Sequence, residues 1–266
     1  MKLRPLTHAA LVFLAVPVMA CTLLHRHQPF DWHVTLEIDQ EVPDREAATN
    51  HAVTTLDSRL SALGLSNYDV KPLPNGRILV SLPNVSDRER LKSLLSSEGQ
   101  LEISHLVSPP SPAPAKLYDS KEAALASFGG KPLPNRLVLP YTERQHAPAD
   151  ARERRWGVVE APAIVASGDL RNATAVAGSN PDEYTIAFSL RPEGAEKFGA
   201  WTGAHISEYV AVIYNGEIKS VAFIKSQIND QGEISGRFTR QSAEDIALIL
   251  KSGALPKVKI IEEGNN

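Results

Sequence analysis

A proline-rich run at residues 109–114 constrains the fold more than any other feature of the sequence. These six residues read PPSPAP. Proline fixes φ and lacks an amide hydrogen, so the run can form neither a helix interior nor an inner strand. Such a run adopts a stiff, extended conformation. We therefore expect a linker at 109–116 with a separately folded unit on each side.

The residues before the linker predict five elements in a recognisable order. Apolar residues alternate with polar ones over 33–39, as in a half-buried strand. A helix from Asp44 to about Leu63 and a hairpin over 68–83, turning at 74–76, follow. Ser86 and Glu89 have the spacing of a capping box before a short helix. A strand at 100–107 completes the order of a ferredoxin-like unit, so we predict a ferredoxin-like base at 33–108.

The residues after the linker predict a second α+β unit. Segment 117–160 is mixed in character, and we treat it as a variable connection. Over 161–256 the patterns indicate a strand at 184–190, a helix opened by Pro192, a hairpin at 209–224 and a helix at 239–251. The hairpin turns at Asn215-Gly216, which suits a type I′ turn. A terminal strand and tail occupy 257–266, and the fold class is α+β.

The N-terminus predicts export and attachment to a membrane. Lys2 and Arg4 precede an apolar stretch at 6–20, which ends in the residues VMAC at 18–21. This pattern is typical of a signal peptide and resembles a lipobox, in which Cys21 would carry the lipid anchor. We therefore expect a signal segment at 1–21 and a tether at 22–32. A retained N-terminal anchor and plain secretion are the alternatives.

Composition and motifs argue against several classes of function. The formal net charge is -3, with 31 acidic and 28 basic residues, which disfavours nucleic-acid binding. The sequence has no Gly-x-Ser-x-Gly elbow and no phosphate-binding glycine loop, so we predict no enzymatic activity and no cofactor. His25, His27 and His33 could chelate a metal, although no acidic or cysteine ligand lies at zinc spacing. We therefore predict no metal site and keep a metal-binding lipoprotein as a third, weaker hypothesis.

Several short motifs follow one another along the chain in an order found in one known family. The C-terminal third supplies most of them: 167–173 (SGDLRNA), 211–220 (AVIYNGEIKS), 234–239 (ISGRFT) and 251–256 (KSGALP). The N-terminal part contributes Arg59, Gly64, Gly76 and Pro83 with their neighbours. Together these motifs resemble the periplasmic part of the SecD subunit of the Sec preprotein translocase, and the resemblance covers residues from about 33 to 263. It implies a SecD-type head at 161–256 on a ferredoxin-like base, the head being either inserted or appended.

The resemblance also implies a role and a location. It implies an accessory factor in protein export, membrane-anchored on the periplasmic face of the cell envelope, that binds unfolded or emerging secreted proteins without catalysis. Sec translocase components are further expected partners. We expect Phe198, Trp201, Tyr214 and Phe223 to be candidates for polypeptide contact. The printed chain ends before the membrane helices of the family. An envelope scaffold lipoprotein that docks a folded partner is the alternative function.

Overall fold

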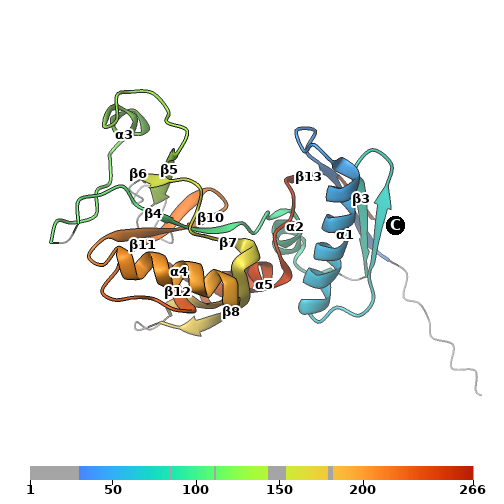
Figure 1. Cartoon of the computed structure of the whole chain (residues 1–266). Helices are drawn as coiled ribbons and strands as arrows, with labels where there is room; N and C mark the ends of the chain where they lie inside the picture. The colour runs from blue at the N-terminus through green and yellow to red at the C-terminus, as the bar shows by residue number, and fades with distance from the viewer. Residues whose placement is uncertain (1–29, 84, 111, 143–153, 179–181, 266) are drawn as a thin grey trace, which may run out of the picture.

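The computed structural model describes residues 30–83, 85–110, 112–142, 154–178 and 182–265. Figure 1 shows two units, with the smaller one built around α1 and the larger one around β10, α4 and α5. Helices α2 and α5 lie where the two units meet (Figure 1). Together the units form an α+β fold, which confirms the predicted fold class.

The smaller unit, called the base below, is a four-stranded antiparallel sheet in the order β13-β1-β3-β2. Its strands are β1 (Trp32–Ile38), β2 (Asp69–Leu73), β3 (Arg77–Leu82) and β13 (Val258–Asn265). Helices α1 (Arg45–Ala62) and α2 (Arg88–Ser96) pack against this sheet. The core of the base contains Val34, Leu36, Ile38, Ala52, Leu56, Leu60, Ile78, Val80, Leu91 and Leu95.

Local signals account for most boundaries in the base. Asp44 caps α1 by accepting a hydrogen bond from the amide of Ala47 at 3.0 Å. The turn between β2 and β3 has φ of 64° at Asn75 and 69° at Gly76, which confirms the predicted hairpin. The predicted cap of α2 was wrong by one residue, because Asp87 rather than Ser86 accepts the hydrogen bond from the third helical amide.

The strand that closes the base sheet comes from the end of the chain. The strand predicted to close it, now β4 (Leu101–His105), lies in the other unit, where it pairs with β10. Its place beside β1 is taken by β13, so the larger unit is inserted between α2 and β13. The prediction of a base confined to 33–108 was therefore wrong. Hydrophobic alternation identifies a strand, but it does not identify the strand's neighbour.

The tether predicted for 22–32 also needs a correction at its end. Trp32 belongs to β1 and is fully buried in the base core. The predicted signal segment and most of the tether lie outside the described residues.

The larger unit, called the head below, contains two sheets. The six-stranded sheet has the order β6-β5-β11-β10-β4-β7, and the three-stranded sheet has the order β12-β9-β8. The strands are β5 (Arg136–Thr142), β6 (Arg154–Glu160), β7 (Val165–Ala166), β8 (Leu170–Ala177), β9 (Tyr184–Leu190), β10 (Tyr209–Tyr214), β11 (Glu217–Phe223) and β12 (Gln231–Phe238). A 3-10 turn, η2 (Ser167–Asp169), joins β7 to β8.

The two sheets and helices α4 (Pro192–Ala204) and α5 (Arg240–Ser252) share one hydrophobic core. Leu101, Val212, Phe188, Phe198 and Leu250 bring together β4, β10, β9, α4 and α5 in that core. The predicted β10–β11 hairpin is confirmed, with φ of 49° at Asn215 and 74° at Gly216. Segment 117–160, for which the sequence predicted no element, contains α3 (Lys121–Ala126), β5 and β6.

Candidate functional site

Two chain crossings join the base to the head, and Arg59 of α1 contacts both. The Arg59 side chain is fully buried. It donates to the carbonyl oxygens of Leu94 at 2.7 Å, Ser97 at 2.6 Å, Glu98 at 3.5 Å and Gly253 at 3.1 Å, and to Ser252 Oγ at 3.2 Å. The first three acceptors lie on the path out of the base, and the last two lie on the path back.

Burial lowers the pKa of Arg59 to about 10, because desolvation disfavours the charged form. The guanidinium keeps its proton at neutral pH and satisfies carbonyl groups at the end of α2 and after α5. A fork of fixed donors suits this task better than a single ammonium group. Arg59 therefore fastens the two crossings to the base.

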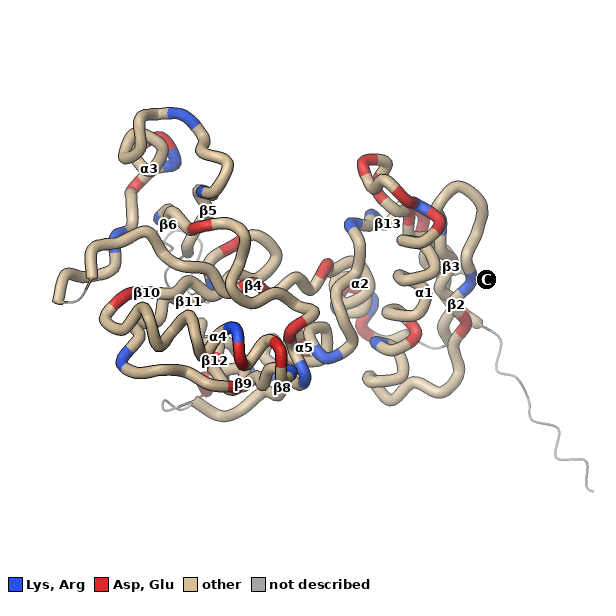
Figure 2. Tube along the Cα trace, viewed as in Figure 1, with Lys and Arg blue, Asp and Glu red and all other residues tan. Residues whose placement is uncertain are grey.

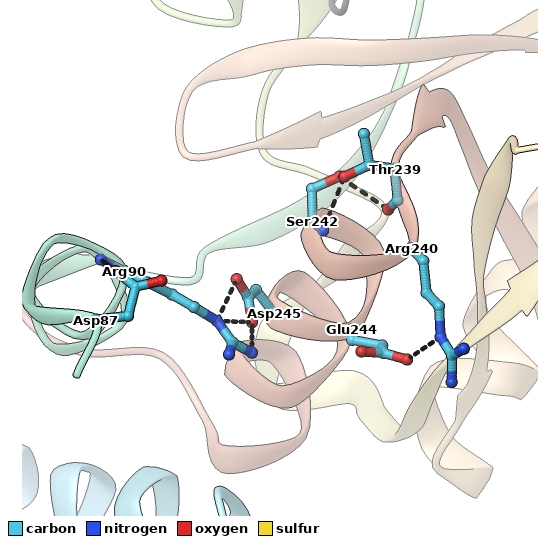
Figure 3. Close-up of polar contacts among 7 residues, drawn as sticks. All are labelled: Asp87, Arg90, Thr239, Arg240, Ser242, Glu244 and Asp245. Atoms are coloured by element: carbon cyan, nitrogen blue, oxygen red, sulfur yellow. Dashed lines mark hydrogen bonds and ion pairs between the residues drawn. The ribbon is translucent and has the colours of Figure 1, made fainter. Parts of the chain in front are cut away.

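An ion pair joins α2 of the base to α5 of the head (Figure 3). Arg90 Nη2 lies 2.6 Å from Asp245 Oδ1, and Arg90 Nε lies 3.2 Å from Oδ2. This two-point contact raises the pKa of Arg90. Figure 3 also shows the pair Arg240–Glu244, which lies within α5 and does not reach the base.

The tip of the β10–β11 hairpin contacts the outgoing crossing. The amide of Gln100 donates to Asn215 Oδ1 at 2.9 Å, and the amide of Asn215 donates to the carbonyl of Gln100 at 2.9 Å. Ser97 Oγ contacts both Asn215 Nδ2 and the Tyr214 hydroxyl at 3.1 Å. Burial raises the pKa of Tyr214. The asparagine that permits the turn therefore also holds the turn against the junction.

The four side chains predicted to contact polypeptide lie in different surroundings. Phe198 and Tyr214 are buried, and both pack in the core of the head. Trp201 is half-buried, and its ring stacks on His205 with centroids 3.9 Å apart. Phe223 is 36% exposed at the end of β11. The structure does not bring the four together, and only Trp201 and Phe223 lie partly at the surface.

Apolar and aromatic side chains lie together at the end of the β10–β11 hairpin opposite its turn. We call residues 205–209 and 223–224, which belong to the head, the hairpin patch. Ile206 is 51% exposed there, and the rings of Tyr209 and Phe223 lie 5.6 Å apart. Backbone hydrogen bonds from Ser207 to Ile224 and from Ile224 to Glu208 close this end. The sequence does not single out Ile206, because an isoleucine directly after a helix carries no local signal that its side chain is exposed.

A histidine beside the hairpin patch contacts two carboxylates. His105 Nδ1 lies 3.1 Å from Glu160, and its Nε2 lies 2.9 Å from Glu208. The ring of His105 also lies 5.3 Å from that of Trp201. Figure 2 shows basic and acidic residues interspersed along the rest of the trace.

Two further features concern metals and membranes. Among the described residues, no group of three or more His, Cys, Asp or Glu side chains could hold a metal ion. His33 lies in β1, whereas His25, His27 and Cys21 fall outside the described residues. No helix in the described part of the chain is long and apolar enough to cross a bilayer.

Comparison with known proteins gives consistent matches to one family. The description "SecDF, P1 head subdomain" matches residues 142–257, and "Protein translocase subunit SecDF, P1 domain, N-terminal" matches residues 49–108. The chain is 36% identical to the protein translocase subunit SecD of Koribacter versatilis and 32% identical to that of Aquifex aeolicus. Each alignment covers 82% of this chain, but only 39% and 40% of the respective relative.

Solved structures show the same fold. A structure of SecDF in its super-membrane-facing form covers 88% of this chain and 30% of the solved chain, with a TM-score of 0.66 and 24% identity. A second, described as a membrane component SecDF that enhances protein export, covers 86% of this chain and 98% of the solved chain, with a TM-score of 0.62 and 25% identity. The chain therefore belongs to the SecD family, and it corresponds to the P1 domain of SecDF with its base and head.

Proposed function

We propose that this protein is an accessory factor in protein export on the extracytoplasmic side of a membrane, and that its head binds unfolded polypeptide without catalysing a reaction. Its membership of the SecD family supports the first part, since the relatives are named protein translocase subunits. The chain spans about two fifths of the length of those relatives, so their complete activity does not transfer directly.

The exposure of the hairpin patch is the observation that supports the binding role. Ile206 is 51% exposed and Phe223 is 36% exposed, and the indole of half-buried Trp201 on α4 stacks on His205, the residue before Ile206. Exposed apolar groups that lie together mark surfaces for partners more often than single exposed residues do. An unfolded secreted protein offers apolar side chains of many kinds, and a surface of this type can accept them without a specific sequence.

Attachment to the membrane through Cys21 is the second part of the proposal. The leader and the VMAC sequence at 18–21 support it. An anchor at this end would leave base and head in the periplasm, where emerging proteins and other Sec components are the proposed partners. Several acyl chains hold a protein at a membrane far more stably than one.

Fluorescence anisotropy would test polypeptide binding. The probe is a labelled secretory protein kept unfolded by reduction and carboxymethylation, and the control is the same protein in its folded form. We expect micromolar binding to the unfolded form, because ordering a flexible client offsets part of the contact energy. The binding should tolerate salt, since apolar contacts are not screened.

Paired substitutions would locate the surface. Ile206→Ser should weaken binding several-fold. Leu133→Ser is the control and should not weaken it, although the Leu133 side chain on the α3–β5 connection is exposed as well, at 36%. Equally strong binding to the folded control would instead indicate the scaffold function, in which a folded partner docks. Absence of binding to the unfolded probe at micromolar protein would contradict the proposed function.

A further inference from the structure

Strand β8 forms one end of the three-stranded sheet of the head. It pairs with β9 on one side, and among the described residues no strand pairs with it on the other side. An edge strand carries a row of backbone N–H and C=O groups that can pair with another extended chain. The register of β8 shows which residues carry that row.

Two hydrogen bonds show which residues of β9 direct their backbone groups toward β8 and which direct them toward β12. The amide of Gly178 donates to the carbonyl of Glu183 at 2.7 Å, and the amide of Leu190 donates to that of Asp230 at 2.8 Å. Hydrogen-bonded pairs alternate with non-bonded pairs in an antiparallel ladder. From the first bond, Asn172, Thr174 and Val176 direct their backbone groups toward β9, opposite Ser189, Ala187 and Thr185. The second bond gives the same result, because it directs Phe188 and Ile186 toward β12.

The outward row of β8 therefore belongs to Ala173, Ala175 and Ala177. Ala177 is exposed and Ala175 is half-buried, whereas Ala173 is buried as a whole residue in the core, where α5 packs against β8. No hydrogen bond joins these three amides to another described residue outside the ladder. The part of the row that a further strand could reach is therefore at Ala175 and Ala177, whose small side chains cover little of the backbone.

The other long edges carry features that discourage pairing with a further strand. Strand β2 contains Pro72, and β13 contains charged residues and a bulge near Ile261. The outer side of β6 is occupied by hydrogen bonds with Tyr118 and Val107. On the far side of its own sheet, β12 carries Glu233 and a bulge. By contrast, residues 173–177 of β8 read ATAVA, without charge, proline or glycine.

We propose that β8 is the site where the head binds an extended segment of its polypeptide client, by adding that segment to the three-stranded sheet as a fourth strand. This inference rests on the proposed function and specifies its mode of binding. The outward N–H and C=O groups would pair with the client backbone, which every sequence shares. The hairpin patch would then bind apolar side chains from other parts of the client.

Proline substitution at the edge tests this mode. In the full-length protein, Ala175→Pro removes an outward amide and leaves the ladder with β9 intact, because proline is tolerated where the N–H faces away from the sheet. Ala175→Ser is the matched control, since it keeps the amide. We expect Ala175→Pro to weaken binding of the carboxymethylated client by roughly five- to tenfold, the loss of one backbone hydrogen bond to the client, and Ala175→Ser to leave it unchanged.

Hydrogen exchange provides a readout that a general loss of stability would not reproduce. The amides of Ala175 and Ala177 in the wild type should exchange more slowly when the client is bound. If Ala175→Pro lowers the thermal midpoint, Ala177→Pro at the exposed position replaces it, with Ala177→Ser as its control.

The outcomes separate this inference from the proposed function. Client binding that is insensitive to both prolines, without protection of the β8 amides, overturns strand addition and leaves the proposed function standing. A client that does not bind the wild type overturns both. Protection of the β8 amides that depends on protein concentration without client would show that a second copy of the chain occupies the edge, and would overturn the client as its partner.

Discussion

The indole Nε1 of Trp32 donates a hydrogen bond to Glu263 Oε1 at 3.0 Å, joining the first strand of the fold to the last. Glu263 also accepts from Lys92 of α2 at 2.9 Å. Both bonds lower the pKa of Glu263, because they stabilise its charged form. The base sheet is therefore complete only with β13, which follows the inserted head in the sequence.

Trp32→Ala should destabilise the protein strongly. Trp32 is fully buried, and large-to-small changes of buried aromatic residues cost about 3–5 kcal/mol. Chemical denaturation followed by circular dichroism would measure the change in free energy of unfolding. Trp201→Ala is the control, and it should cost less because Trp201 is only half-buried. Equal costs would contradict the assignment of Trp32 to the base core.

Arg59→Lys should destabilise the junction although it conserves the charge. One ammonium group cannot reach the acceptors on both crossings, and each lost bond to a charged donor costs about 1.5–3 kcal/mol. We expect a lower denaturation midpoint than for Arg154→Lys, a control at an exposed position of β6. An unchanged midpoint for Arg59→Lys would show that its hydrogen bonds do not stabilise the junction.

Arg90 and Asp245 should be coupled in a double-mutant cycle. The side chains are 37% and 19% exposed, so screening by solvent limits the coupling to about 1 kcal/mol, and salt should reduce it. The pair Arg240–Glu244 is the matched control, for which a smaller coupling is expected because both side chains are more exposed to solvent. Coupling of Arg90 to Asp245 below that of the control would contradict a stabilising contact between base and head.

Gly216→Val should destabilise the head by roughly 1–3 kcal/mol. Gly216 has φ of 74°, which a β-branched residue adopts only with strain. Gly168→Val is the control, because a Cβ at Gly168 would meet no atom within 4 Å and Gly168 has no positive φ. The difference between the two midpoints measures the strain of the turn, and no difference would argue against it.

Cys21 should be acylated in the mature protein. Mass spectrometry of the purified protein from membranes should show a lipid-modified N-terminal cysteine and loss of residues 1–20. Cys21→Ser should remain unprocessed and unacylated. A wild-type protein that keeps its leader would rule out the lipid anchor and favour the retained N-terminal anchor.

The sequence by itself determined the family and many of the local elements, although it predicted none over 117–160, where α3, β5 and β6 lie. Residue types with strong backbone preferences mark the two hairpin turns at Asn75-Gly76 and Asn215-Gly216, and apolar spacing marks α1 and α5. These signals act between residues close in sequence, so a single chain displays them directly. The motifs of the C-terminal third identified the SecD family for the same reason, because each is a short contiguous run.

Only the tertiary structure decided which segments become neighbours. Both β4 and β13 read as strands, yet nothing in their own residues shows that β13 pairs with β1 and that β4 joins the head. For the same reason the sequence does not show that Arg59 is buried at the junction of base and head, since its acceptors there lie 35 to 194 residues away. It also hid the open edge of β8, since an edge is defined by the absence of a neighbour. Pairing and burial depend on the packing of the whole chain, whereas turns and periodicity depend on a few adjacent residues.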